Sequence, residues 1–124
     1  MADVPFRKII PTLRVRDVAA TLVWYRDTLG FKVEGQQGDV FGSVTRGFGR
    51  DAAAVNIYFL CDGEPIQPAL CYVLVDEVDD LCREFRARGA TIVEEPADRP
   101  WGYRQFLLED LNGHRFYFFR FLEA

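Results

Sequence analysis

Apolar and polar residues alternate through residues 8–15, the first regular pattern in the chain. Ile9, Leu13 and Val15 fall on one side of an extended backbone, and the even-numbered residues between them fall on the other. This alternation predicts a half-buried strand over residues 8–15. Pro11 lies inside it, and because proline cannot donate a backbone hydrogen bond, we expect the strand at a sheet edge or at a hinge.

The pattern then changes to the period of a helix. Val18, Leu22 and Tyr25 recur at intervals of three and four residues, which places them on one helix face. Asp17 stands before them as an N-cap, and Gly30 supplies a C-terminal stop. The sequence therefore predicts an amphipathic helix between Asp17 and Gly30.

Short runs of β-branched and aromatic residues, separated by turn residues, predict the other strands. A second helix is expected over residues 79–88. The remaining strands are expected at 31–34, 40–46, 53–60, 70–75, 90–93, 103–109 and 115–121. The resulting order is one strand, one helix and three strands, followed by the same five elements again.

The two halves of the chain also share sequence. Val15-Arg-Asp-Val18 and Val75-Asp-Glu-Val78 lie 60 positions apart, and this offset pairs Tyr25 with Phe85. Self-similarity at a fixed offset indicates an internal duplication of a βαβββ module.

The duplication divides the chain into module one, about residues 6–61, and module two, about residues 68–121, joined by a linker at 62–67. A module of this size buries too little surface to be comfortably stable alone. We therefore expect both modules to pack into a single domain over residues 1–124.

Composition and charge narrow the class of partner. The chain is 49% hydrophobic and 27% charged, which is typical of a globular protein. Its 15 Lys and Arg against 19 Asp and Glu give a net charge of −4. An acidic chain is poorly suited to neutralising phosphates, so we expect no nucleic-acid partner and favour a cationic or neutral one.

Membrane and secretion signals are not apparent in the sequence. The longest mostly apolar stretch, residues 52–61, is far shorter than the roughly 20 residues that span a bilayer. The first residues lack the pattern of a secretory signal, so we expect a cytoplasmic protein.

The three cysteines, Cys61, Cys71 and Cys82, are odd in number and form no CxxC pair, which indicates free thiols within the core.

Aromatic residues are the one unusual feature of the composition. The chain holds 11 Phe, 5 Tyr and 2 Trp, or 15% of its residues. Either the core is rich in aromatic side chains or a groove is lined with them.

Three segments carry a resemblance to a known superfamily. They are Val23-Trp-Tyr-Arg-Asp-Thr-Leu-Gly-Phe31, Pro100-Trp-Gly-Tyr-Arg-Gln-Phe106 and Asp110-Leu-Asn-Gly113. Together with the two βαβββ modules they resemble the vicinal oxygen chelate superfamily of glyoxalases, extradiol dioxygenases and bleomycin resistance proteins. The resemblance implies an α+β fold in which each module curls its mixed sheet into a half-barrel around a cavity. In the enzymes of the superfamily, a divalent metal lies in that cavity.

The resemblance also indicates where this chain would hold such a metal. The four ligand positions fall at Ile10, Tyr58, Leu70 and Tyr117. Aliphatic side chains cannot bind a metal, and neutral tyrosine is a poor ligand for ions that prefer imidazole and carboxylate. We therefore expect no metal and no cofactor.

No catalytic residue emerges from the sequence. His114 is the only histidine and directly follows Gly113, so we expect a turn residue there and not a ligand or a base. Glu109 and Asp110 are neighbours on a strand and point to opposite faces, so they do not form an acid and base pair.

Residues on the cavity side of the predicted strands are the candidate ligand contacts. If position 10 faces the cavity, alternate positions on the first and last strands of each module face it too. These candidates are Thr12, Asn56, Tyr58, Tyr72 and Tyr117. Aromatic walls with a few polar groups suit a planar or cationic molecule, which they bind by stacking and cation–π contacts.

Within the superfamily, residues 10–20 and 99–106 are most similar to the metal-free bleomycin resistance proteins. This resemblance implies that Phe41 and Trp101 flank the groove. It also implies a homodimer with exchanged N-terminal strands, in which Pro11 would be the hinge.

The function we favour is therefore a dimeric, metal-free small-molecule-binding protein that sequesters a cationic or aromatic antibiotic of the glycopeptide type, such as bleomycin. The alternative is a metal-dependent glyoxalase-like or dioxygenase-like enzyme with atypical ligands, which would recruit His114 or Glu109. A third hypothesis is a protein that binds a metabolic or regulatory ligand, and the residues do not distinguish it from an antibiotic-sequestering protein.

Overall fold

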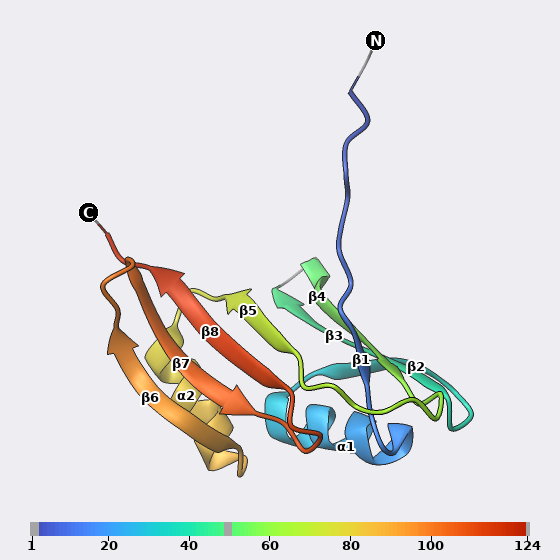
Figure 1. The fold of residues 1–124 in the computed structure, drawn as a ribbon. Coiled ribbons are helices and arrows are strands. Elements are labelled where there is room, and N and C mark those ends of the chain that lie inside the picture. The colour runs from blue at the N-terminus through green and yellow to red at the C-terminus, as the bar shows by residue number, and fades with distance from the viewer. Residues whose placement is uncertain (1–2, 49–50, 124) are drawn as a thin grey trace.

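The computed structural model describes residues 3–48 and 51–123 and has the predicted α+β organisation of two four-stranded mixed sheets and two helices (Figure 1). The first half contains β1 (Thr12–Arg14), α1 (Val18–Leu29), β2 (Lys32–Gln37), β3 (Phe41–Phe48) and β4 (Asp51–Leu60). The second half contains β5 (Leu70–Leu74), α2 (Val78–Ala87), β6 (Thr91–Asp98), β7 (Tyr103–Glu109) and β8 (Arg115–Phe121).

The two sheets repeat one topology. The first has the strand order β1-β4-β3-β2 and the second the order β5-β8-β7-β6. In each sheet the first strand runs parallel to the last, and the other pairs are antiparallel. A helix follows the first strand of each sheet because a parallel connection needs a crossover segment.

Helix α1 begins and ends where the sequence predicts. The Asp17 side chain accepts a hydrogen bond from the Ala20 backbone N–H at 2.9 Å, which satisfies one of the free donors of the first turn. Gly30 ends the helix in the left-handed conformation with φ of 68°, a value that favours glycine. Tyr25 on this helix and Phe85 at the equivalent position of α2 are both buried, in agreement with the offset between the halves.

The helix-bearing sides of both sheets share one core. Tyr25 illustrates this, because its ring lies 4.7 Å from that of Phe59 on β4 and 6.3 Å from that of Phe116 on β8. The core cluster includes residues from α1, α2 and strands of both sheets. As a result, each sheet has one side against this core and another side turned away from it.

The turn after β7 joins the two halves through polar groups. The Asp110 carboxylate accepts hydrogen bonds from the Tyr25 hydroxyl at 2.6 Å and from the backbone N–H groups of Asn112 and His114 at 2.8 Å each. Asn112 in turn donates to the Thr21 hydroxyl at 3.1 Å. A turn motif that the sequence shows only as a resemblance therefore fastens α1 to the second sheet.

The strand predicted over residues 8–15 is wrong in its first half. Strand β1 covers only Thr12–Arg14, where Leu13 is buried as expected. Residues 3–9 instead leave the body of the molecule as an extended segment (Figure 1), whereas the Pro11 carbonyl still accepts from the Tyr58 N–H at 2.9 Å. Ile9, expected on the buried side, is 90% exposed, because within the described residues no strand pairs with residues 3–9.

Two smaller corrections concern exposure and length. Of the three cysteines, all free, only Cys82 is fully buried, while Cys61 and Cys71 are half-buried. Strand β6 continues to Asp98, five residues beyond its predicted end, because it follows β7 along the sheet edge with two register shifts.

Among the described residues, no helix is long and apolar enough to cross a membrane.

Candidate functional site

The second sheet turns a strongly aromatic side away from the core. Residues that pair across β5, β8 and β7 place their side chains on the same side, as in Tyr72 opposite Tyr117 and Tyr103 opposite Phe121. We call this surface the aromatic face. It consists of Tyr72, Trp101, Tyr103, Tyr117, Phe119 and Phe121.

The rings of the aromatic face other than Trp101 touch one another in a continuous cluster. Tyr72 stacks on Tyr117 with ring centroids 4.8 Å apart, and Tyr103 stacks on Phe119 at 4.5 Å. An edge contact between Tyr72 and Phe119 at 5.6 Å joins the two stacks. The face is therefore a preformed platform and not a set of separate side chains.

A shallow hollow of about 500 Å³ lies on this platform. Tyr72, Trp101, Tyr103 and Phe119 line it. Trp101 is 56% exposed, and its indole N–H donates to the side-chain oxygen of the buried Gln105 at 3.3 Å, which fixes the ring beside the hollow. An exposed but oriented indole is well suited to stacking on a ligand.

One polar group is built into the aromatic face. The Tyr117 hydroxyl donates to the Glu94 carboxylate on β6 at 3.1 Å, and Arg99 lies 3.6 Å from the same carboxylate. Partial burial, followed by the Glu94 acceptor, raises the pKa of Tyr117 above its usual value. Because Arg99 offsets the charge of this carboxylate, the electron-rich rings of the face are its groups for binding a cation.

Three members of the aromatic face were not among the predicted site residues: Tyr103, Phe119 and Phe121. Taken singly, each of these rings suits a core position equally well. The signal for all three is the pairing of β7 with β8, which sets Tyr103 opposite Phe121 and Gln105 opposite Phe119. Such pairing between strands is not visible in a single strand's alternation.

The other predicted site residues lie on the first sheet, on its side away from α1. Thr12 is opposite Tyr58 in the register of β1 and β4, and Phe41 contacts Tyr58 edge to face at 5.0 Å. Asn56 is 8% exposed and donates to the Ser43 hydroxyl at 3.1 Å and the Val44 carbonyl at 2.9 Å. We call this side of the first sheet the polar face.

The structure thus groups the predicted site residues into two sets. Tyr72, Trp101 and Tyr117 lie on the aromatic face, whereas Thr12, Phe41, Asn56 and Tyr58 lie on the polar face. No ring contact or hydrogen bond among the described residues joins one set to the other within the chain. Their role in ligand binding remains a prediction.

The donor groups on these faces do not fit a metal centre. Tyr117 and Tyr58 stand at two of the four expected ligand positions, and the other two are aliphatic. Across residues 3–48 and 51–123, no group of three or more His, Cys, Asp and Glu side chains gathers in space. Glu109, a possible substitute ligand, is paired with Arg115 at 3.0 Å.

His114 has a structural role that the sequence did not reveal. The side chain is 1% exposed, its Nε2 lies 2.7 Å from the Arg14 carbonyl, and its Nδ1 accepts from the Ala69 N–H at 3.0 Å. It therefore lies at the end of the turn, as expected, but fastens β1 to the segment before β5. Both ring nitrogens are occupied by backbone groups, so neither is free to bind a metal or move a proton.

A family model and several solved structures match this chain. The model of the glyoxalase/bleomycin resistance protein/dioxygenase superfamily matches residues 10–118. TioX from Micromonospora sp. ML1 is 26% identical, with a TM-score of 0.78 over 94% of this chain and 100% of that one. None of the curated proteins matches.

Two further structures share the fold at lower identity. A bleomycin-binding protein from Streptomyces verticillus, crystallised with copper(II)-bleomycin, is 20% identical, with a TM-score of 0.75 over 98% of this chain and 100% of that one. A glyoxalase-related enzyme from Clostridium phytofermentans is also 20% identical, with a TM-score of 0.79 over 96% and 98%. The same fold therefore occurs in a binding protein and in a protein described as an enzyme.

Proposed function

Because this chain belongs to the glyoxalase/bleomycin resistance protein/dioxygenase superfamily, we propose that it binds and sequesters a small cationic or aromatic molecule without transforming it. The observation that carries this proposal is the aromatic face. Tyr72 is 49% exposed and Trp101 is 56% exposed, although a core would bury such rings. Exposed, stacked rings around a hollow are typical of a surface that takes up a planar or cationic group.

Chemistry supports binding over catalysis. The positions where a metal would be held carry tyrosine and aliphatic residues, while His114 and Glu109 are engaged elsewhere. A molecule on the aromatic face would meet rings, the Tyr117 hydroxyl and the Glu94 carboxylate. These groups can hold a ligand, and none of them is arranged as a nucleophile with an adjacent base.

We infer the ligand class from the net charge of the chain and from the fold that it shares with a bleomycin-binding protein. A net charge of −4 favours the approach of a cation, and the rings of the aromatic face can bind one at short range by cation–π contacts. The bleomycin-binding protein described above shares the fold and binds such a glycopeptide. We therefore propose a glycopeptide antibiotic of the bleomycin class as the ligand and antibiotic resistance as the biological role.

A dimer completes this proposal. Among the described residues, no ring contact or hydrogen bond joins the aromatic face to the polar face, so the polar face of a second copy can cover the aromatic face. Thr12, Phe41 and Tyr58 would then line the other wall of a groove. An exchange of N-terminal segments hinged at Pro11 would hold the two copies together, because residues 3–9 are exposed in the single chain.

Titration calorimetry of the untagged protein with a bleomycin-class compound tests the proposed function. We expect saturable binding at about one ligand per chain, weakened about tenfold by Tyr72→Ala, because stacking and cation–π contacts are worth about 1–2 kcal/mol. Tyr72→Phe keeps the ring and should bind like the wild type. Equal affinity in the wild type and Tyr72→Ala would remove the aromatic face as the site, and a stoichiometric metal in the purified protein would favour the enzyme.

A further inference from the structure

The N-terminal arm, defined here as residues 3–9, carries apolar and basic side chains that are exposed. Figure 1 shows the arm extending away from both sheets. Phe6 is 99% exposed and Ile9 is 90% exposed. Arg7 and Lys8 stand between them, and within the described residues neither forms an ion pair. Exposed apolar side chains of this kind indicate a segment that another surface covers.

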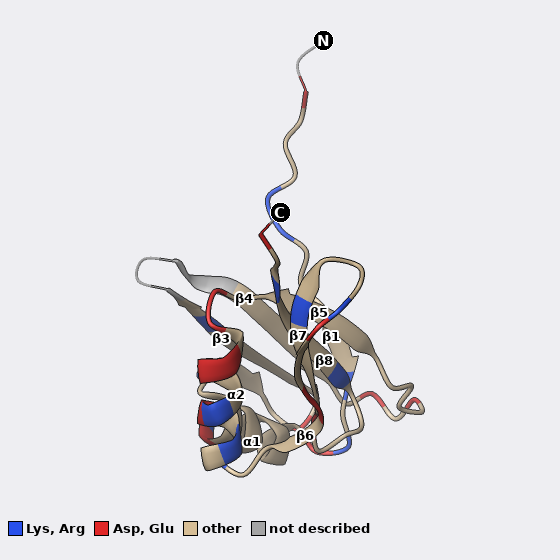
Figure 2. Ribbon diagram, turned by 90° about the vertical axis from the view of Figure 1, so that its left-hand side faces the viewer, with Lys and Arg blue, Asp and Glu red and all other residues tan. Residues whose placement is uncertain are grey.

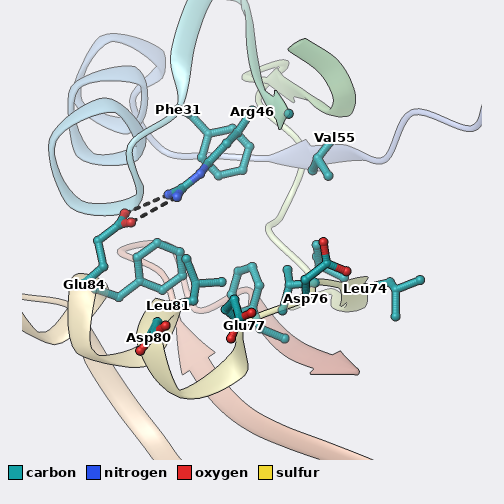
Figure 3. A pocket seen from close by; sticks show the side chains of 14 residues that line it. Phe31, Arg46, Val55, Leu74, Asp76, Glu77, Asp80, Leu81 and Glu84 are labelled. Atoms are coloured by element: carbon teal, nitrogen blue, oxygen red, sulfur yellow. Dashed lines mark hydrogen bonds and ion pairs between the residues drawn. The ribbon is translucent and has the colours of Figure 1, made fainter. Parts of the chain in front are cut away.

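A cleft of about 450 Å³ opens between the two sheets beside the start of α2 (Figure 3). We call it the inter-sheet cleft. Its walls are mostly apolar and come from both halves of the chain. They include Phe31, Val55, Val73, Leu81, Phe85 and Phe118. The volume lies within the range of about 300–1,000 Å³ typical of pockets that bury sizeable groups.

Four carboxylates, all from residues 76–84, lie along the α2 side of the inter-sheet cleft. Glu84 closes one end, where Arg46 from β3 donates to it at 2.8 and 3.1 Å (Figure 3). Asp80 lies further along α2 and pairs with Arg83 outside the cleft. Asp76 and Glu77 stand at the entrance to α2, are exposed, and form no ion pair or side-chain hydrogen bond among the described residues.

The unpaired charges of the arm and of the cleft are complementary. Figure 2 shows acidic residues gathered around the start of α2 and basic residues on the arm. Arg7 and Lys8 supply two positive charges, and Asp76 and Glu77 supply two negative ones. The apolar residues on either side of the basic pair, Phe6 and Ile9, match the apolar walls of the cleft. The arm therefore carries basic and apolar side chains, and the cleft carries the acidic and apolar side chains that match them.

From this match we infer that the inter-sheet cleft receives the N-terminal arm of a second copy of this chain. The chain's own arm extends away from both sheets in Figure 1, so the occupant comes from the other copy. Seven extended residues reach roughly 23–25 Å, enough to cross between two bodies in contact. The inference rests on the homodimer of the proposed function and adds the surface that holds the exchanged arm.

Charge reversal tests the inference directly by sedimentation equilibrium without any ligand. The arm variant is Arg7→Glu with Lys8→Glu, and the cleft variant is Asp76→Lys with Glu77→Lys. Each variant alone places like charges at both contacts of a symmetric dimer. We expect each to raise the dimer dissociation constant at least tenfold, and more so at low salt, where charges are less screened.

An equal mixture of the two variants provides the decisive test. In the mixed dimer, the reversed arm meets the reversed cleft and the native arm meets the native cleft, so both contacts are again complementary. We expect the mixture to regain the affinity of the wild type. A control with the same charge change on exposed acids outside the cleft, Asp39→Lys with Glu64→Lys, should dimerise like the wild type.

Each outcome decides the inference. Restoration of the dimer in the mixture, with an unaffected control, supports it. Variants that dimerise as tightly as the wild type, or a mixture that stays weak, overturn it and leave the dimer and the ligand site of the proposed function in place. A monomeric wild type overturns both the dimer and this inference. Circular dichroism of every variant shows whether it is folded.

Discussion

At the scale of single residues, buried polar side chains decide how the two halves of the molecule are joined. Tyr25 and His114 both look ordinary in the sequence, one as an apolar position of a helix and the other as a turn residue. In the structure, Tyr25 donates to Asp110 at 2.6 Å, and His114 links the Arg14 carbonyl to the Ala69 N–H. Such bonds join residues 45 to 100 positions apart, which no local pattern can indicate.

Tyr25 gives a prediction about pH. Burial, and then the neighbouring Asp110 carboxylate, raises the pKa of Tyr25 well above 10.0 in the folded protein. The unfolded chain therefore loses this proton near pH 10 while the folded one keeps it, so the stabilisation is complete below pH 10 and is lost as the pH rises.

Tyr25→Phe tests this coupling by urea unfolding from pH 7 to 11. At pH 7 the variant should be less stable by about 1–2 kcal/mol, because Asp110 loses a donor. Above pH 10 this difference should shrink by about 1.4 kcal/mol per pH unit. A difference that stays constant across the range would show that Tyr25 does not retain its proton through Asp110.

At the scale of elements, local signals predicted those parts whose neighbours lie close in the sequence. Helix α1 begins after Asp17 and ends before Gly30 because its cap and its stop are local. Strands β7 and β8 also match their predicted bounds, because the residues that mark their ends lie next to them in the sequence. The strand around Pro11 was predicted too long, because its start depends on a pairing partner that the described strands do not supply.

The contact between α1 and β3 also depends on a residue without an obvious role in the sequence. Gly42 lies in β3, and a Cβ atom there would come within 3.0 Å of both Leu22 Cδ2 and Val18 Cγ1. Gly35 in β2 would meet nothing within 4 Å. Neither glycine has a positive φ, so space alone distinguishes them.

We predict that Gly42→Ala lowers the free energy of unfolding by about 1–3 kcal/mol, since the buried side chains of Leu22 and Val18 must shift to admit the methyl group. The matched variant Gly35→Ala should change it by no more than about 0.5 kcal/mol. Chemical unfolding of both variants measures the difference. Equal stabilities would mean that α1 adjusts without cost and that the close approach is not required.

At the scale of the whole molecule, two similar sheets share one core and turn different surfaces outward. The sequence predicted which strand positions lie on these outer sides, because alternation within a strand is local. It did not predict that the aromatic set and the polar set stay apart in one chain, since that follows from how the sheets pack on α1 and α2. We therefore propose that a groove built from both sets forms between two copies of the chain.

The aromatic face is the surface on which the proposed function depends, and Trp101 is its natural reporter. The only other tryptophan, Trp24, lies on α1, so Trp24→Phe leaves Trp101 as the sole source of tryptophan fluorescence. The most direct measurement is a fluorescence titration of this variant with a bleomycin-class compound. The proposed function predicts a saturable change that reaches its plateau at about one ligand per chain. An unchanged emission up to about 1 mM, where even a binding free energy of about −4 kcal/mol gives half saturation, would contradict it.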